Sequence, residues 1–502
     1  MIAAAPPLSA PPRASASLVW LAAAASLLLV IALFLTGRVA LLRLAIPVGA
    51  VFVGFALYFR RPIGYLHFTL WVWFLTPLVR RLVDWRAGFE DQNLLLLAPL
   101  LVSMIAGLTC LDRRRTAAAV RPISFFFCAA GIFYGFTVGL IRWRLHDSDA
   151  SSAGEIVYAL LNWLAPLILG LHLYLRWPMY EQHKQAIQKS FLWATLILGA
   201  YGVYQFVAPP PWDRLWLEHM LSDIGAASFG LPEPFQTRVW STLNSPSVFA
   251  DMLVTGLLLL FFERSRVKPL AVVAGYSSFL LSLVRTSWLG WLVGVAVVAR
   301  RSGGRQMTRL LLWLFLLPAM VAPLMLIPQI AAVVTQRLQT FLSIKKDDSA
   351  QIRAEEYRVL LSSLAAEPFG QGLNQVQTYR GYMMDSGILR LLYYFGWVGA
   401  ALFLIGIGLC ARGMSLSSAR SSADLVAPVY RAVLVAMMFE MFSENTFIGP
   451  TGAIVWICIG LGLSVHQTER VSSSSAEQLE LLAQENRVPS VLVAWRTEAR
   501  TH

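Results

Sequence analysis

The amino-acid sequence predicts an all-α polytopic membrane protein. Of its 502 residues, 57% are hydrophobic and only 14% are charged, a balance that a soluble domain of this length would not tolerate on its surface. Long apolar runs separated by short charged loops recur between residues 18 and 466. Because a hydrocarbon core about 30 Å thick needs roughly 20 apolar residues per helix, these runs predict about 14 transmembrane helices in a single domain.

Basic residues in short loops set the predicted orientation. When the spans are counted, the loops richest in arginine and lysine fall on one side of the membrane, at residues 60–61, 113–115, 176–189, 264–268, 300–309 and 412–420. This side is predicted to be the cytoplasm, because short cytoplasmic loops carry an excess of Arg and Lys. Residues 1–17 then form a disordered cytoplasmic N-terminus, and residues 467–502 form a cytoplasmic tail.

Two longer segments, at about 209–246 and 335–387, are predicted on the outer face. Loops of this length in a compact protein are usually functional or disordered. In the second segment the apolar residues Tyr357, Leu360 and Leu364 recur at helical spacing. This spacing predicts an amphipathic helix at the outer surface.

Composition also argues against several partners. The net charge is +13, but the basic residues are spread over short loops instead of forming a binding module, so we predict membrane lipid and no nucleic acid as a partner. Each of the four cysteines lies in an apolar run without metal-ligand spacing. We therefore predict no disulfide, no metal site and no cofactor.

Topology does not explain a set of arginines that the orientation places on the outer face: Arg80, Arg81, Arg86, Arg142, Arg144, Arg214, Arg238, Arg285, Arg337, Arg353, Arg358, Arg380 and Arg390. Arg285 is the sharpest case, because it stands between two apolar runs and charge at membrane depth costs about 2.5–3.5 kcal/mol. These side chains either reach lipid headgroups and outer acids such as Asp84 and Glu233, or converge on a phosphate group, which guanidinium binds bidentately.

Three ordered passages between residues 237 and 400 carry motifs. Residues 237–246 read Thr-Arg-Val-Trp-Ser-Thr-Leu-Asn-Ser-Pro and lead into an apolar helix, and residues 283–290 read Leu-Val-Arg-Thr-Ser-Trp-Leu-Gly. The third passage combines Arg353 and Tyr357 with 367–372, 385–389 and 396–399. In order and in outer placement, the set resembles the O-antigen ligase and polymerase superfamily.

The resemblance implies a GT-C-like fold and a metal-independent glycosyltransferase of the bacterial inner membrane whose site faces the periplasm. At the position of Asp385, ligases of the superfamily usually carry His followed by Asn or Ser, so Asp385 favours the surface-polysaccharide polymerase branch. Such an enzyme joins repeat units carried on undecaprenyl pyrophosphate, and a chain-length regulator protein is an expected partner. It acts on O-antigen, capsule or exopolysaccharide units.

Arg238 and Arg285 are the predicted catalytic arginines, because a pyrophosphate leaves readily once its charge is neutralised. The alternatives are a loop salt bridge for Arg238 and an interhelical ion pair for Arg285. Asp385 is predicted to orient or deprotonate the acceptor hydroxyl, the alternative being helix capping. The predicted substrate-binding residues are Arg353, Tyr357, Arg358, Arg380, Arg390, Asn244 and Glu444.

Three further expectations concern titratable side chains. Glu440 and Glu444 lie one helical turn apart and are predicted to face one side of the penultimate helix, where ion pairs with arginines are favoured over catalysis. His219, in the first outer loop, is a reserve base or an inert surface histidine.

Three rival functions remain open at this level. A ligase of the same fold passes a finished glycan to lipid A or another terminal acceptor, and it leaves the glycan's length unchanged. A transporter or flippase of lipid-linked oligosaccharide recognises pyrophosphate without chemistry. A purely structural membrane subunit is the third rival, and the concentration of outer arginines argues against it.

Overall fold

The structure is a computed structural model. It describes residues 14–91, 93–111, 122–145, 152–224, 229–300, 348–374, 378–379, 382–420, 424 and 426–484, together with a few short pieces between 308 and 335. The predicted span near 310–334 therefore lies largely outside the described residues, as do most of the N-terminal segment 1–17 and residues 485–502 of the tail.

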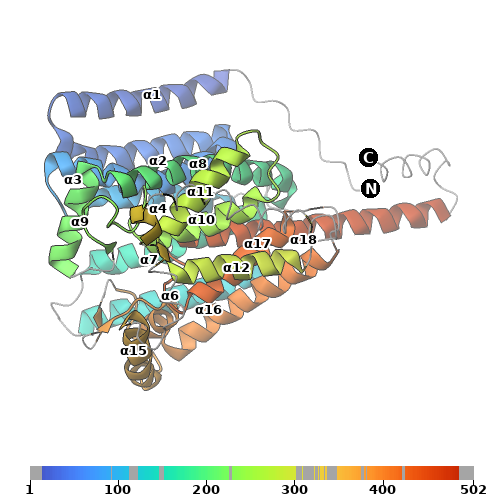
Figure 1. The fold of residues 1–502 in the computed structure, drawn as a ribbon. Coiled ribbons are helices and arrows are strands. Elements are labelled where there is room, and N and C mark those ends of the chain that lie inside the picture. Colours follow the sequence, from blue (N-terminus) through green and yellow to red (C-terminus); the bar gives the residue numbers. More distant parts are fainter. Residues whose placement is uncertain are drawn as a thin grey trace.

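The described chain is almost wholly α-helical (Figure 1). Its α-helices are α1 (Ala14–Leu35), α2 (Leu42–Arg60), α3 (Pro62–Ala87), α4 (Leu97–Met104), α5 (Leu108–Leu111), α6 (Ile123–Leu145), α7 (Ala153–Leu175), α8 (Tyr180–Val207), α9 (Pro211–Ile224), α10 (Pro246–Leu260), α11 (Lys268–Leu281), α12 (Arg285–Ala299), α15 (Asp348–Ala365), α16 (Gly387–Arg420), α17 (Ala427–Glu440) and α18 (Gly449–Gln484). Short 3-10 turns are η1 (Val39–Leu41), η2 (Leu94–Leu96), η3 (Ile105–Gly107) and η4 (Trp177–Met179). A two-residue hairpin pairs β1 (Thr378–Tyr379) with β2 (Tyr382–Met383).

Seven of the helical segments are long and apolar enough to cross a membrane. They span 39–60, 62–87, 94–111, 123–145, 153–175, 177–207 and 387–415, and shorter apolar helices occur at 24–35, 246–260, 268–281, 285–299 and 449–465. The prediction of an all-α membrane protein is therefore confirmed. The figure of fourteen crossings stays a prediction.

The long helices lie side by side as a bundle in which partners are often distant in sequence. The most extensive pairings join α16 to α6, α18 to α7, α11 to α8 and α12 to α17. Glycine permits the closest approaches: a Cβ added at Gly131 on α6 would lie 2.7 Å from the carbonyl oxygen of Gly399 on α16. Small residues have this role in membrane bundles because packing, and not hydrophobic burial, drives helix association in lipid.

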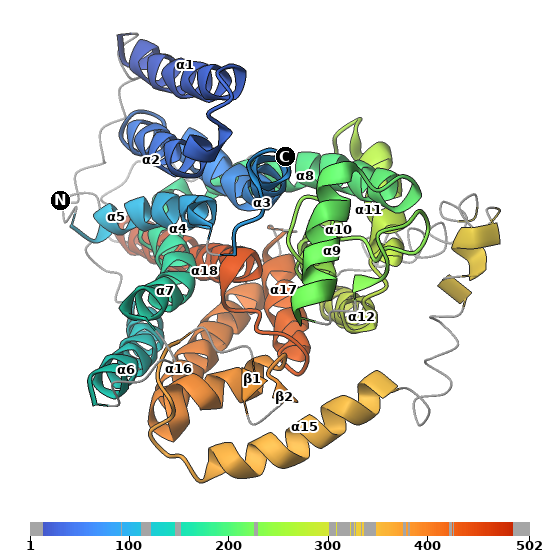
Figure 2. The ribbon, with the colours of Figure 1, turned by 90° about the vertical axis from the view of Figure 1, so that its left-hand side faces the viewer.

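Both predicted outer segments contribute helices at the same end of the bundle. α9 and α15 lie at this end, whereas the described chain begins with Ala14 and ends with Gln484 at the other (Figure 1). Figure 2 looks at the α9 and α15 end: α15 runs across it, while α12 is seen nearly down its axis. The predicted amphipathic helix is present as α15, and its Leu360 and Leu364 are buried. The last helix, however, continues to Gln484, well beyond the predicted end of the membrane domain at 466.

Candidate functional site

The first two motif passages are bound to each other. The side chain of Arg238 donates from Nε to the carbonyl oxygen of Ser282 and from Nη2 to that of Leu283, both at 3.3 Å. Nearby, the backbone N–H of Val239 donates to Leu281 at 3.1 Å. Arg285 is the first residue of α12 and follows this turn directly. The structure therefore places the segments of the two predicted catalytic arginines in direct contact.

The turn before Arg285 has an uncommon backbone conformation. Leu283 has a φ of 55°, in the left-handed region that branched and bulky side chains rarely adopt. Because the Leu283 carbonyl oxygen accepts from Arg238, the first passage helps to hold this conformation. Strained residues of this kind persist only where their surroundings fix them, and they gather at functional sites.

A buried ion pair fixes the end of the first passage. Arg81 on α3 lies 2.9 Å from Asp213 on α9, and neither side chain is exposed. The same guanidinium donates to the carbonyl oxygens of Ser241 and Leu243 at 2.5 and 2.6 Å. Arg81 therefore joins an outer helix to the loop that carries Asn244. The sequence indicated Arg81 only as one member of the set of predicted outer arginines. No pattern in the sequence indicated a role for Asp213.

Below the start of α12 lies a pair of buried carboxylates. The hydroxyl of Ser287 is 2.6 Å from Glu440 Oε2 and 3.2 Å from Asp251 Oδ1. Thr451 donates to Asp251 Oδ2 at 3.3 Å. The single hydroxyl of Ser287 on α12 therefore lies between carboxyl groups of α10 and α17. Asp251, the one charged residue of the apolar helix α10, was not predicted from the sequence.

The predicted ion pair for Glu440 is therefore wrong. Among the residues that the structure describes, Glu440 accepts a hydrogen bond from Ser287 and pairs with no arginine. The shared helix face with Glu444 is also corrected, because α17 ends at Glu440 and Glu444 lies in the connection to α18. The prediction of a shared face was wrong because it extended the penultimate helix as far as Glu444, whereas α17 ends at Glu440.

Glu444 lies just after the C-terminal end of α17. Ser247 on α10 and the charges of Arg390 and Asp385 act on its carboxyl group. Its Oε2 atom is buried with no hydrogen-bond partner among the described residues. Burial, and then the negative charge of Asp251, raises the pKa of Glu444 to about 8, because both disfavour the charged carboxylate.

The third motif passage meets this region through α15 and the start of α16. The hydroxyl of Tyr357 hydrogen-bonds to Ser386 and donates to the carbonyl oxygen of Phe442 at 3.0 Å. Asp385 precedes α16 and is exposed. The capping bond at this helix start comes from Ser386, whose hydroxyl accepts from the N–H of Leu389. Capping therefore does not occupy the Asp385 carboxylate.

The remaining predicted binding residues divide into two groups. Arg390 donates to the carbonyl oxygen of Met384, and Asn244 stands just before α10 with its Oδ1 buried and unbonded within the described structure. Arg358 lies apart: its side chain is 78% exposed and pairs with Glu355 on the same helix. The side chain of Arg353, and Arg380 as a whole, lie outside the described residues.

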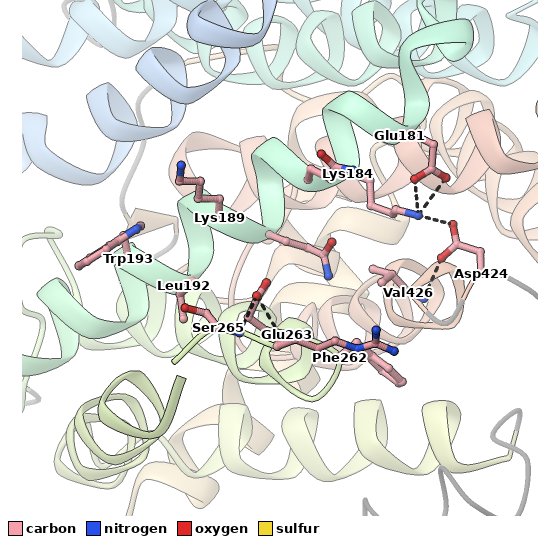
Figure 3. Close-up of a pocket in the computed structure, with 13 residues that line it drawn as sticks. Glu181, Lys184, Lys189, Leu192, Trp193, Phe262, Glu263, Ser265, Asp424 and Val426 are labelled. Carbon is pink, nitrogen blue, oxygen red and sulfur yellow. Dashed lines mark hydrogen bonds and ion pairs between the residues drawn. The ribbon is translucent and has the colours of Figure 1, made fainter. Parts of the chain in front are cut away.

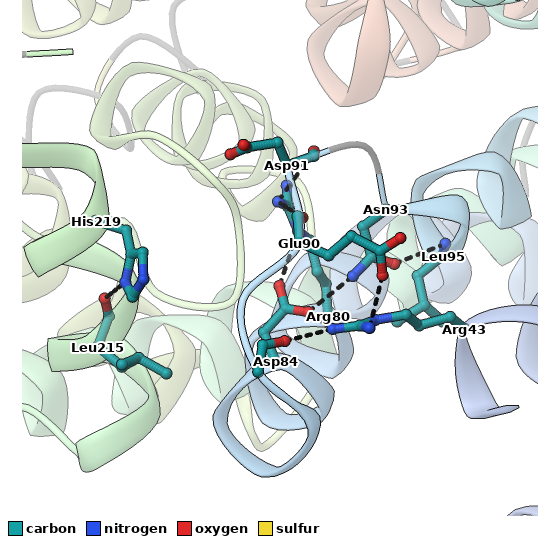
Figure 4. A network of polar contacts seen from close by, with 10 residues as sticks. Arg43, Arg80, Asp84, Glu90, Asp91, Asn93, Leu95, Leu215 and His219 are labelled. Atoms are coloured by element: carbon teal, nitrogen blue, oxygen red, sulfur yellow. Dashed lines mark hydrogen bonds and ion pairs between the residues drawn. The ribbon is translucent and has the colours of Figure 1, made fainter. Parts of the chain in front are cut away.

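Other polar groups near α9 form structural networks (Figure 4). Asp84 pairs with Arg43 at 2.9 Å and with Arg80 at 3.2 Å, which confirms Asp84 as a partner of an outer arginine. His219 stacks on Phe89 with ring centroids 4.2 Å apart, and its Nδ1 is 2.8 Å from the carbonyl oxygen of Leu215. This packing favours the inert reading of His219.

Replacing Glu440 by glutamine is expected to keep the fold and most of the activity, because the amide oxygen still accepts from the Ser287 hydroxyl. Glu440→Ala removes the nearer acceptor of the buried Ser287 hydroxyl, which lies at 2.6 Å, and is expected to cost about 1–3 kcal/mol. Thermal unfolding of the purified variants in detergent measures this difference. A glutamine variant as unstable as the alanine variant would contradict the role assigned to the bond between Ser287 and Glu440.

The candidate site thus has two parts. Arg238 and Arg285 are joined through the turn before α12. Glu444, in the connection between α17 and α18, is acted on by Arg390 and Asp385 at the start of α16. Asp251 links the two parts, because it bonds to Ser287 on α12 and acts electrostatically on Glu444. No family model matches the chain, and no curated protein matches its sequence.

Proposed function

We propose that the protein is a glycosyltransferase that polymerises surface-polysaccharide repeat units, transferring glycan from an undecaprenyl-pyrophosphate-linked donor to a lipid-linked acceptor at the periplasmic face. The observation that carries this proposal is the bonding of the Arg238 passage to the turn before Arg285, next to a group of carboxylates. Guanidinium and carboxylate groups together meet the two needs of the reaction: a stabilised leaving group and an activated acceptor.

The arginines act on the leaving group. In a single displacement the acceptor oxygen bonds to the anomeric carbon while the bond from that carbon to the pyrophosphate oxygen breaks, which inverts the anomeric configuration. Negative charge then grows on the pyrophosphate. Fixed guanidinium groups at that position lower the barrier because they stabilise charge that develops in the transition state.

A carboxylate takes the proton of the acceptor hydroxyl. Asp385 is exposed and its carboxylate is left available by the capping role of Ser386. Glu444 is the second base candidate, because its Oε2 has no bonding partner in the described structure and its raised pKa makes it a stronger base once it is ionised. Tyr357 contacts Ser386 beside Asp385, and Arg390 acts on Glu444; with Asn244 they are proposed to hold the sugar and phosphate.

The pH dependence distinguishes the two bases. If Glu444 accepts the proton, kcat/KM is expected to rise about tenfold per pH unit and to level off near pH 8, because only the ionised carboxylate is active below that value. Glu444→Gln would then abolish the rise and most of the activity. A wild-type profile already flat between pH 6 and 8, with Glu444→Gln active, would assign the role to Asp385.

Incubation of the purified protein with a lipid-linked repeat unit in detergent tests the function. A polymerase yields a ladder of lengths from one repeat unit, and a ligase leaves the length of each glycan unchanged. The third outcome, no longer glycan while vesicles show movement of the lipid, identifies a flippase and overturns the proposal.

A further inference from the structure

The helix α8 carries polar side chains in two different surroundings. In its first half, Lys184 lies 2.7 Å from Glu181 and 3.2 Å from Asp424 beside a polar cavity of about 760 Å³ (Figure 3), so these charges neutralise one another. Near the other end of the helix stands Gln205, whose side chain is fully buried. A buried amide needs partners for both of its polar atoms, because an unpaired polar group in the interior costs free energy.

The Gln205 amide joins the loop that carries Arg238 to the helix α9. Its oxygen accepts from two consecutive backbone N–H groups, at 3.1 Å from the nitrogen of Trp240 and 2.8 Å from that of Ser241. On the other side, its Nε2 donates to Asp213 Oδ2 at 2.6 Å. Backbone N–H groups only donate and an ionised carboxylate only accepts, so this orientation of the amide satisfies both sides.

The turn that Gln205 holds has a strained backbone. Ser241 has a φ of 54°, in the left-handed region that residues with a side chain rarely adopt. Arg81 binds carbonyl oxygens of this turn while Gln205 binds its N–H groups, and both side chains also contact Asp213. Such a conformation persists only where neighbouring groups fix it.

The backbone bonds around this turn set the position of Arg238. The N–H of Arg238 donates to the carbonyl oxygen of Phe229 at 3.0 Å, and the N–H of Val239 donates to that of Leu281 at 3.1 Å. Gln205 takes the next two N–H groups, which have no other acceptor in the described structure. Loss of the amide would therefore leave two buried donors unpaired, and the loop would have to rearrange to satisfy them.

We propose that Gln205 is a positioning residue: its amide fixes the turn after Arg238 and thereby holds this arginine against the turn before α12. This role rests on the proposed function, in which Arg238 stabilises the departing pyrophosphate. The side chain of Arg238 reaches the carbonyl oxygens of Ser282 and Leu283 from its present position. Displacement of a catalytic group by about 1 Å can lower a rate about a hundredfold.

Hydrogen exchange of residues 239–243 tests the hold on the turn without any assay of activity. This segment is expected to exchange slowly in the wild type and faster at two amides in Gln205→Met, because the thioether is only a weak acceptor. Tyr201→Phe is the matched control: it removes a hydroxyl that donates to the same Asp213 oxygen at 2.9 Å and that forms no hydrogen bond with the turn in the described structure. This control is expected to exchange as the wild type does. Fast exchange of the segment in the wild type would overturn the proposal even if the methionine variant did not fold.

The rate of ladder formation tests whether Gln205 acts through Arg238. Gln205→Met is expected to lower the wild-type rate about ten- to a hundredfold and to leave the residual rate of Arg238→Ala unchanged, because no arginine is then left to position. Tyr201→Phe is expected to keep the wild-type rate. Equal losses in the two backgrounds, or a normal rate in a methionine variant whose segment exchanges fast, would overturn the proposal. A wild type that forms no ladder would instead overturn the proposed function, and hydrogen exchange would then decide alone whether Gln205 holds the turn.

Discussion

Arg285→Ala is expected to lower the rate of chain extension by about a hundred- to a thousandfold while the protein still folds and inserts. A loss of this size is typical when one fixed donor is removed from a developing negative charge. Arg285 is partly exposed at the first position of α12, so its removal leaves no large internal cavity. The measurement is the initial rate of ladder formation by purified protein at a fixed concentration of lipid-linked repeat unit.

Two comparisons make this prediction specific. Arg285→Lys keeps the charge but loses the planar fork that binds phosphate bidentately, so it is expected to fall between the wild type and alanine. Arg144→Ala removes an exposed arginine at the outer end of α6, where the side chain lies over Trp143, and it is expected to leave the rate unchanged. An Arg285→Ala protein with normal insertion and a normal rate would remove this residue from the site.

Arg81→Ala is expected to have the largest effect on stability. The substitution leaves Asp213 buried without its countercharge and removes the donors to the carbonyl oxygens of Ser241 and Leu243. Breaking a buried ion pair by removing one partner costs about 3–5 kcal/mol. Activity is expected to fall as well, because the loop that these bonds hold carries Arg238 and Asn244. Thermal unfolding in detergent measures the loss of stability.

Arg80→Ala on the same helix provides a control for the Arg81 prediction. Arg80 shares Asp84 with Arg43 and Asn93, so Asp84 keeps partners when Arg80 is removed, and the free energy of unfolding is expected to fall less. Equal stability of the Arg81→Ala and wild-type proteins would contradict the structural role assigned to the Arg81 and Asp213 pair.

The parts of the fold that the sequence predicted are those with a strong local signal. Long apolar runs predicted the membrane helices, and apolar spacing around Leu360 and Leu364 predicted α15. The order of the arginine passages predicted that Arg238 and Arg285 belong together, and the structure joins their segments through the Leu283 turn.

The contacts that connect distant helices were not predictable from one sequence. Asp251 stands singly in an apolar helix, and only the packing of α10 against α12 and α17 brings it to Ser287 and Glu440. The end of α17 at Glu440 was missed for a different reason: apolar residues such as Met441 and Phe442 continue the hydrophobic pattern after the helix has ended. The local pattern of apolar residues therefore predicted the helices. The partners of the polar side chains depend on how those helices pack, which the pattern does not specify.

The central claim is that Arg238 and Arg285 together bind the diphosphate that leaves during transfer. It is tested most directly by the affinity of the purified protein for undecaprenyl pyrophosphate, measured against undecaprenyl monophosphate in the wild type and in the Arg238→Ala and Arg285→Ala variants. We expect the wild type to prefer the diphosphate and each variant to lose that preference. Equal affinity for both lipids in the wild type, or an unchanged preference in both variants, would contradict the account.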